Sequence, residues 1–392
     1  MATNKIRVLT ISKPYVSAAY RQKLTDLSKD GRFEIALICP LRWDQRSFEE
    51  SANDTFPIWK LPISFNGWNH FYFYLGLERV FREFRPDIVN IEEEHYSIVT
   101  LQATRLANKH HCKTIFYTWQ NIHKNYPLPF RLIEKFVFRH ASIGVCGNED
   151  AAKIIRDKGF QGATPVIPQM GVDPVLFSPP SYEESFKRNL RTQLGLRRES
   201  FWMSYFGRLV PEKGIDLLLK AIPLITTEHP EVKCIIVGDG PEANKLRELC
   251  RTLAIEDRVS FIREVPSTEV PRYLQAVDVL CLPSLTKPNW KEQFGRILAE
   301  AMTAGTVVVG SNSGEIPRVI GKCGLIFAEG DEKALAGAVK KLIEKPTLWK
   351  ELQMSGVKLA NEHYSSQAVA KEFSEVFASL RPKQDSDSNV SI

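Results

Sequence analysis

Short apolar runs alternate with helical stretches along most of the chain, and this alternation constrains the fold more than any other feature. An apolar run at residues 6–11 precedes a helical stretch at about 18–29 and a second apolar run at 33–39. The same order returns later, with apolar runs at 201–206 and 232–237 flanking a helix. Strand–helix–strand units build mainly parallel sheets covered by helices. We therefore expect an α/β protein with two Rossmann-like domains.

The length of 392 residues suits two domains, each with its own core. Prolines at 174–180 and the charged stretch 183–199 predict the boundary between them. We expect a first domain at 1–178, a linker at 179–200 and a second domain at 201–363. A terminal helix at 364–381 and a polar, disordered tail at 382–392 complete the predicted organisation.

Composition excludes several classes of protein. No run of about 18 apolar residues occurs, and the first residues predict a strand rather than a secretory signal, so we expect a cytoplasmic protein. The seven cysteines are scattered without C-x-x-C spacing and predict buried reduced thiols. His110 and His111 are adjacent rather than at ligand spacing, and we expect no bound metal. The net charge of +6 does not predict nucleic-acid binding.

Residues 291–305 form a loop-to-helix junction that carries two carboxylates, Glu292 and Glu300. Apolar residues from 297 onward repeat at helical spacing, so the helix is predicted to begin near Gly295. The N–H groups of its first turn would bind an anion such as a diphosphate. One carboxylate would then accept hydrogen bonds from a hexose and the other from a ribose. The alternative is that Glu300 is a solvated helix residue and Glu292 a helix-entry charge.

The pattern Glu-x7-Glu around Phe294-Gly295, then Glu-Ala-Met-x-x-Gly and the segment 307–319, resembles the donor site of the retaining GT-B glycosyltransferases of family four. The resemblance is specific over about residues 200–330. It implies two domains facing a cleft, with Glu292 on the hydroxyls of the donor sugar and Glu300 on the ribose. It also makes Phe294, Gly295 and Arg296 part of the nucleotide-sugar site. Gln293 stands where the family usually has glycine.

Two cations follow the strand predicted at 201–206. Gly207 allows a tight turn, and Arg208 and Lys213 come next. Positive charge there would stabilise a departing diphosphate without a metal. The alternative, two solvated surface cations, is outweighed by the resemblance, whose Gly-Arg…Glu-Lys-Gly pattern is present. The resemblance adds a further set of nucleotide-binding candidates: Gly238, Arg263, Val265 and Ser284.

The first domain supplies the predicted acceptor side. The carboxyl ends of parallel strands form ligand-binding edges, and Ser12, Glu94, His95 and Asn121 each follow a predicted strand. Each is also compatible with a plain loop role. The family's glycine pair after the first strand and its histidine near residue 119 are missing. The aromatic stretch 65–75 fits a packed core, a hydrophobic acceptor groove or a membrane-contact patch.

The sequence thus predicts retaining transfer of a hexose from a UDP- or GDP-sugar to a hydroxyl of a saccharide or lipid-linked acceptor, as in polysaccharide or glycoconjugate synthesis. No cofactor or metal is expected, and peripheral contact with the inner face of a membrane is a further expectation. Two alternatives stay open. A nucleotide-sugar epimerase of the same fold would use acids among Glu92–Glu94, and a non-catalytic module would only bind the sugar nucleotide.

Overall fold

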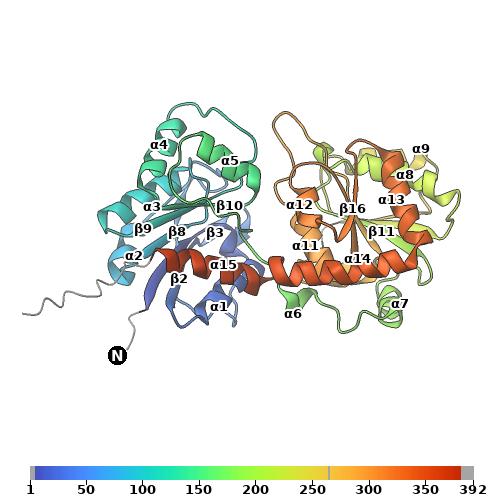
Figure 1. Cartoon of the computed structure of the whole chain (residues 1–392), viewed down its shortest axis with the longest axis horizontal. Coiled ribbons are helices and arrows are strands. Elements are labelled where there is room, and N and C mark those ends of the chain that lie inside the picture. Colours follow the sequence, from blue (N-terminus) through green and yellow to red (C-terminus); the bar gives the residue numbers. More distant parts are fainter. Residues whose placement is uncertain (1–4, 264, 381–392) are drawn as a thin grey trace, which may run out of the picture. The chain divides into compact units, whose positions relative to one another are not determined.

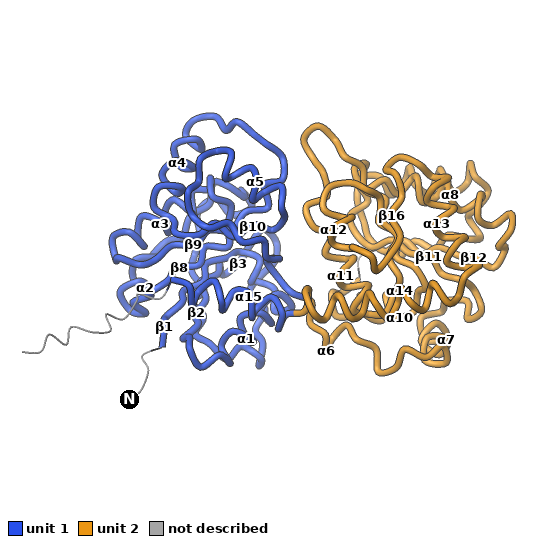
Figure 2. The backbone as a smooth tube through the Cα atoms, in the orientation of Figure 1, with its two compact units in different colours: residues 1–171, 366–392 blue, residues 172–365 orange. Residues whose placement is uncertain are grey.

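The computed structural model describes residues 5–263 and 265–380, which form two compact units (Figures 1 and 2). Among these residues, the first unit comprises 5–171 and 366–380, and the second comprises 172–263 and 265–365. The predicted tail, 382–392, lies outside the described residues.

The first unit is built on a six-stranded parallel sheet with the order β10-β9-β8-β1-β2-β5. Its strands are β1 (Ile6–Ile11), β2 (Phe33–Pro40), β5 (Ile58–Leu61), β8 (Ile88–Ile91), β9 (Lys113–Thr118) and β10 (Ile143–Cys146). Its helices are α1 (Gln22–Ser28), α2 (Leu77–Phe84), α3 (Ile98–Lys109), α4 (Phe130–His140), α5 (Glu149–Asp157) and α15 (Ser366–Ser379). Two short antiparallel pairs complete it: β3 (Arg42–Trp43) with β4 (Arg46–Ser47), and β6 (Ile63–Ser64) with β7 (Phe73–Tyr74).

Alternate side chains of β1 pack on opposite faces of this sheet. Val8 packs into a core shared with α1 and α15, whereas Leu9 packs into a core shared with α2 and α3. Successive side chains of a strand point to opposite faces, so a fully buried strand is apolar throughout. Helix α15 contributes Phe373 and Phe377, and the Phe377 ring lies edge-on to Phe33 at 5.8 Å. The last described helix of the chain therefore completes the core of the first unit.

The second unit repeats the design with the order β13-β12-β11-β14-β15-β16. Its parallel strands are β11 (Phe201–Phe206), β12 (Val232–Val237), β13 (Val259–Ile262), β14 (Val279–Leu282), β15 (Val307–Ser311) and β16 (Gly324–Phe327). Its helices are α6 (Pro174–Phe177), α7 (Glu184–Gln193), α8 (Ile215–Thr226), α9 (Ala243–Thr252), α10 (Val270–Ala276), α11 (Arg296–Thr303), α12 (Ile316–Ile320), α13 (Glu332–Glu344) and α14 (Pro346–Leu359).

The boundary differs from the expected linker. The units divide at residues 171/172, and the range 179–200 contains α7 rather than an extended connection. Buried Arg191 of α7 binds Asp278, which also accepts a hydrogen bond from the Trp202 amide. The charged stretch that predicted the domain boundary thus fixes α7 to the second unit.

Candidate functional site

Glu292 is the centre of a polar cluster at the carboxyl edge of the second sheet. Its Oε2 accepts 2.6 Å from Lys213 Nζ and 2.9 Å from Ser284 Oγ. Lys213 ends a single 3₁₀ turn (Pro211–Lys213) after β11, and Ser284 follows β14, the neighbour of β11 in the sheet. Strand order therefore brings together three residues that the sequence separates. Glu292 is buried, so its charge needs these two donors.

The loop that carries Glu292 is fixed by contacts of its backbone. The Glu292 carbonyl accepts 3.1 Å from the Glu315 amide. Gly314 has a φ of +56°, and a Cβ there would lie 2.1 Å from the Glu292 carbonyl oxygen, so no larger residue fits. The Lys213 ammonium also lies 5.0 Å from the centre of the Trp290 ring. Neither Gly314 nor Trp290 was among the residues predicted from the sequence.

Helix α11 begins after Gly295, the predicted start. Gly295 has a φ of +74°, and a Cβ there would lie 2.9 Å from Leu282 Cδ2. One turn on, Arg296 Nε donates 2.7 Å to Glu300 Oε1. Phe294 is buried and packs edge-on to Tyr364. The site is thus a helix N-terminus flanked by Glu292 on one side and by the Arg296–Glu300 pair on the other.

The other predicted residues of the second unit lie at the same sheet edge. Gly207 and Gly238 directly follow the neighbouring strands β11 and β12, and Arg208 is exposed. Arg263, after β13, donates 2.6 Å to Asp239 Oδ2, and this guanidinium lowers the pKa of the Asp239 carboxyl. Val265 is half-buried. Burial, reinforced by the nearby Glu292 charge, raises the pKa of the Tyr205 hydroxyl, which donates to the Arg208 carbonyl.

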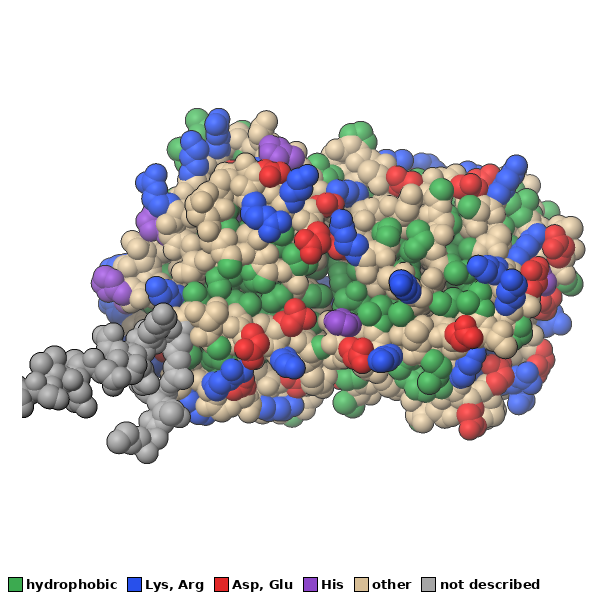
Figure 3. Space-filling model, in the orientation of Figure 1, with side chains coloured by type: hydrophobic (Ala, Val, Ile, Leu, Met, Phe, Trp, Pro, Cys, Tyr) green, Lys and Arg blue, Asp and Glu red, His purple; other side chains and the backbone are tan. Residues whose placement is uncertain are grey.

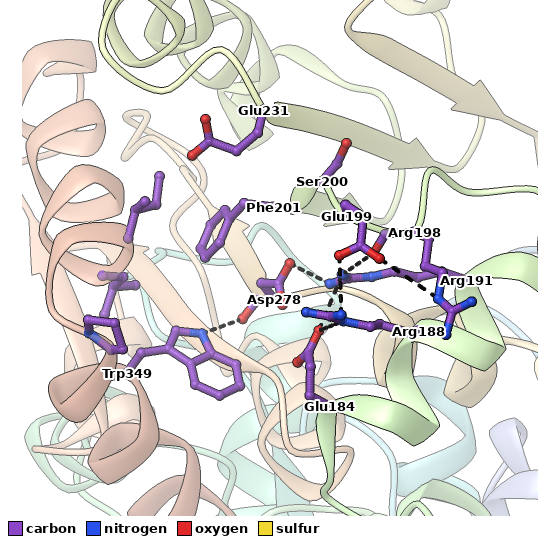
Figure 4. Close-up of a pocket in the computed structure, with 13 residues that line it drawn as sticks. Glu184, Arg188, Arg191, Arg198, Glu199, Ser200, Phe201, Glu231, Asp278 and Trp349 are labelled. Carbon is purple, nitrogen blue, oxygen red and sulfur yellow. Dashed lines mark hydrogen bonds and ion pairs between the residues drawn. The ribbon is translucent and has the colours of Figure 1, made fainter.

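A cavity of about 260 Å³ lies at the opposite end of this sheet (Figure 4). It borders Phe201, the first residue of β11, and Asp278, which precedes β14. Its arginines are engaged: Arg191 bonds Asp278, and Arg188 pairs with Glu184. This cavity is built around the clamp that holds α7 and is separate from the Glu292 cluster.

In the first unit, the three consecutive glutamates after β8 bind three different partners. Glu92 binds the fully buried Lys23 at 2.6 Å, and Glu93 binds Lys13. Glu94 accepts 2.7 Å from Thr118 Oγ1 and 2.9 Å from the amide of Trp119, and it keeps partial exposure. Desolvation lowers the pKa of Lys23 despite its partner Glu92.

The remaining acceptor-side candidates point inward. His95 has no exposed surface; its Nε2 lies 3.0 Å from Glu134 Oε1 and its ring stacks on Phe138. Ser12 is also fully buried and donates to the Glu92 carbonyl, and Asn121 is 5% exposed. The position after a strand was correctly placed for each, but that position alone does not fix which way a side chain turns.

The seven cysteines are free thiols, and five of them are buried. Within residues 5–263 and 265–380, no helix combines the length and the apolar character needed to cross a bilayer.

Two family models match the chain in succession. Residues 25–176 match Glycosyltransferase Family 4, and residues 186–358 match Glycosyl transferases group 1. Each of the two units thus carries its own match.

Curated relatives share part of the chain. A GDP-mannose-dependent alpha-(1-6)-phosphatidylinositol monomannoside mannosyltransferase of Mycolicibacterium smegmatis is 27% identical over 215 residues, 54% of this chain and 55% of the relative. A phosphatidylinositol N-acetylglucosaminyltransferase gpi3 subunit of Schizosaccharomyces pombe is 34% identical over 137 residues, 35% of this chain and 29% of the relative. The matches thus span about half or less of the length of these relatives.

Among solved structures, Anabaena HepE in complex with UDP superposes with a TM-score of 0.72 at 20% identity, covering 96% of this chain and all of that one. This likeness concerns the fold, in which two units with Rossmann-like parallel sheets follow one another. The two family models show that the chain belongs to the glycosyltransferases of family four, and the superposition shows that its fold is GT-B.

Proposed function

We propose that this protein transfers a hexose from a nucleoside diphosphate sugar to a hydroxyl of a saccharide or lipid-linked acceptor, with retention of the anomeric configuration. The observation that carries the proposal is the convergence of Lys213 and Ser284 on buried Glu292 beside the start of α11. A carboxylate held by two donors is oriented to accept hydrogen bonds from sugar hydroxyls, and the adjacent ammonium and helix N-terminus favour a diphosphate.

In the proposed reaction, the bond between the anomeric carbon and the diphosphate oxygen breaks as the acceptor oxygen bonds the same carbon. The acceptor proton passes to the departing phosphate oxygen. Arg208 and Lys213 would stabilise the charge on that oxygen, together with the first amides of α11, which is why we propose metal-independent catalysis. Glu292 would hold the sugar and Glu300 the ribose. Gly207, Gly238, Arg263, Val265, Phe294 and Arg296 would border the nucleotide.

The proposal also covers the nucleotide base of the donor and the residues that contact the acceptor. A relative that uses GDP-mannose and a structural neighbour that binds UDP support both UDP- and GDP-sugars as candidates. On the acceptor side, we retain Glu94, because it alone of the four candidates has a partly exposed side chain beyond its two hydrogen bonds. We propose a cytoplasmic location, which the seven free cysteines support, and a role in polysaccharide or glycoconjugate synthesis.

Epimerisation without an acceptor is less well supported. It would need catalytic acids among the glutamates after β8, yet Glu92 and Glu93 are committed to ion pairs with Lys23 and Lys13. A module that only binds the sugar nucleotide is separated from an enzyme by the experiment below.

The test measures thermal stabilisation by UDP, GDP, ADP and their sugars, with and without magnesium. Wild type, Arg208→Ala and the control Arg251→Ala are compared, because Arg251 is an exposed arginine of α9 paired with Glu248. We expect one nucleoside diphosphate to stabilise wild type and Arg251→Ala without magnesium, and Arg208→Ala to lose most of this shift.

Transfer is then followed with glycan and lipid-linked acceptors, and the configuration of the product is read by NMR. Absence of stabilisation by any nucleotide contradicts the donor site. Binding without transfer or donor hydrolysis favours the binding module, and an inverted product contradicts retention.

A further inference from the structure

Large exposed hydrophobic side chains gather in two segments of the first unit. Among the described residues, eleven large hydrophobics are exposed, and six of them fall within residues 65–75 and 128–132. These six, which we call the aromatic–leucine patch, are Phe65, Trp68, Phe71, Leu75, Leu128 and Leu132. Trp68 is 61% exposed and Leu128 is 69% exposed, so neither contributes much to the core. Clustered exposed hydrophobics mark an interaction surface.

The two segments touch each other through aromatic rings. Trp68 and Phe71 lie edge-on at 5.8 Å, and Phe71 lies edge-on to Phe130, the first residue of α4, at 5.0 Å. Phe65 contacts both Trp68 and Phe73. The loop between β6 and β7 and the start of α4 therefore form one continuous surface.

The exposed face of α4 is basic. Arg131, Lys135 and Arg139 are exposed at spacings of four residues, next to Leu132. Glu134 is the acid of this helix, and it turns inward to His95 and Lys158. In Figure 3, basic and hydrophobic side chains lie together along the α4 edge of the first unit. Meanwhile residues 62–77 contain no Asp, Glu, Lys or Arg at all.

An open groove of about 510 Å³ borders the patch between β7, α2 and α3. Phe73, Ile98 and Leu101 supply apolar lining, and the exposed Arg105 stands at its rim. The Arg105 guanidinium lies 5.7 Å from the ring centre of Phe136 in α4. Glu78 also lines the groove and pairs with Arg82 and Lys109, so the apolar lining extends beyond the patch while the rim carries both signs of charge.

We propose that this surface docks the protein on the interface of an anionic lipid bilayer. Trp and Phe side chains favour the headgroup level of a membrane, leucines reach into the acyl boundary, and cations on the same face attract anionic headgroups. The inference goes beyond the transferase activity, because it depends on the first unit's surface and not on the Glu292 cluster.

Charge favours a bilayer over a second copy of the chain as the occupant. In a two-fold dimer through this face, each α4 would meet the same surface of its partner, so that Arg131, Lys135 and Arg139 would add to the like charge at the contact. An anionic membrane instead neutralises all three. Two acids lie near this surface: Asp44, whose side chain is beside Gly67 in the loop, and Glu78, which lines the groove and is paired with Arg82 and Lys109.

The test measures binding of the full chain to sucrose-loaded vesicles by sedimentation. One set of vesicles is phosphatidylcholine alone, and the other contains about 30% phosphatidylglycerol, which gives a strongly negative surface. Four variants are compared with wild type: the patch variants Trp68→Ser/Leu132→Ser and Lys135→Gln/Arg139→Gln, and two controls. The controls are Val175→Ser/Met354→Ser and Lys245→Gln/Lys358→Gln, which change exposed side chains of the second unit.

We expect wild type and both controls to bind the anionic vesicles, with binding that weakens as salt rises. The charge variant should bind about 30-fold more weakly, since each cation near such a surface contributes about 1 kcal/mol. The apolar variant should bind at least about tenfold more weakly at every salt concentration. Neither variant should lose stabilisation by the nucleotide, which keeps failure here distinct from failure of the donor site.

Three results would overturn the proposal. Wild type could remain in the supernatant with anionic vesicles, or the patch variants could bind as well as the controls. Alternatively, analytical ultracentrifugation could show a dimer that the Trp68→Ser/Leu132→Ser change dissociates, without vesicle binding, which would assign the face to a second copy.

Discussion

Lys213 and Glu292, 79 residues apart in the sequence, form an ion pair of 2.6 Å at the carboxyl edge of the second sheet. Both side chains are largely shielded from water, and Ser284 adds a hydrogen bond to the same carboxylate oxygen. Neither charge is therefore an ordinary surface charge, and removal of one partner leaves the other poorly solvated.

We predict that Lys213→Met lowers the free energy of unfolding by about 2–3 kcal/mol, somewhat less than for a fully buried pair because Lys213 keeps some exposure. The double variant Lys213→Met/Glu292→Gln should recover part of this loss, since no unpaired carboxylate remains. Urea denaturation of the four proteins of this double-mutant cycle measures the coupling. If the two single changes are additive, the pair is not coupled and the prediction is wrong.

Gly314 should tolerate no side chain, because its Cβ would meet the backbone of Glu292. Gly76 provides a control: it is left-handed, with a φ of +79° and a ψ of 13°, and a Cβ there would meet nothing within 4 Å. We expect Gly76→Ala to cost about 1 kcal/mol from the left-handed backbone alone, and Gly314→Ala to cost about 2–4 kcal/mol with added overpacking.

The same comparison tests the site. Gly314→Ala should lower the affinity for the donor nucleotide far more than Gly76→Ala does, because it displaces the loop of Glu292. Equal unfolding free energies and equal nucleotide affinities for the two variants would show that the loop yields easily.

Glu300→Ala should leave stability almost unchanged while weakening nucleoside binding. Its pair with Arg296 spans one helical turn, and such pairs contribute about 0.3–0.5 kcal/mol. If Glu300 holds the ribose, the variant should lose affinity for the nucleoside diphosphate in calorimetry but keep its affinity for inorganic pyrophosphate. Asp216→Ala, which removes a similar pair with Lys220 on α8, is the control. Equal losses for both ligands would place Glu300 at the diphosphate instead.

The sequence predicted the elements that carry the second-unit candidates, because these residues sit in short local motifs. Gly295 was recognised as the helix start, and Arg208 and Lys213 were recognised after a strand. Contacts that depend on which strands are neighbours in the sheet could not be predicted from the sequence. Gly314 approaches Glu292 only because β15 lies beside β14, and no local pattern encodes that neighbour.

In the first unit, the direction of the candidate side chains could not be predicted from the sequence. Because Glu94 and His95 are polar and follow a strand, the sequence suggested that both face a ligand. In the structure, however, the side chains of these adjacent residues point in different directions. The aromatic rings around His95 and the carboxylate of Glu134 draw it into the core, whereas Glu94 stays at the edge. Side-chain direction in such a turn depends on packing partners that are distant in sequence, such as Phe138 on α4. The aromatic stretch 65–75 likewise divides into buried Tyr72 and exposed Trp68.

Buried thiols should make the protein less stable in alkali. Burial raises the pKa of the Cys39 thiol to about 12, whereas the pKa of a thiol in an unfolded chain is about 8.5. Between these values the unfolded chain has lost a proton that the folded chain retains. The free energy of unfolding therefore falls as pH rises, by up to about 1.4 kcal/mol per pH unit for each such thiol.

Cys39→Ala should reduce this slope by up to that amount, although it lowers stability at pH 7 by creating a cavity. Val8→Ala, in the same core, creates a cavity without removing a titrating group and should keep the wild-type slope. Urea denaturation at several pH values between about 8 and 10 measures all three slopes. Parallel curves for Cys39→Ala and wild type would mean that the thiol ionises alike in both states, and that burial does not suppress its charge.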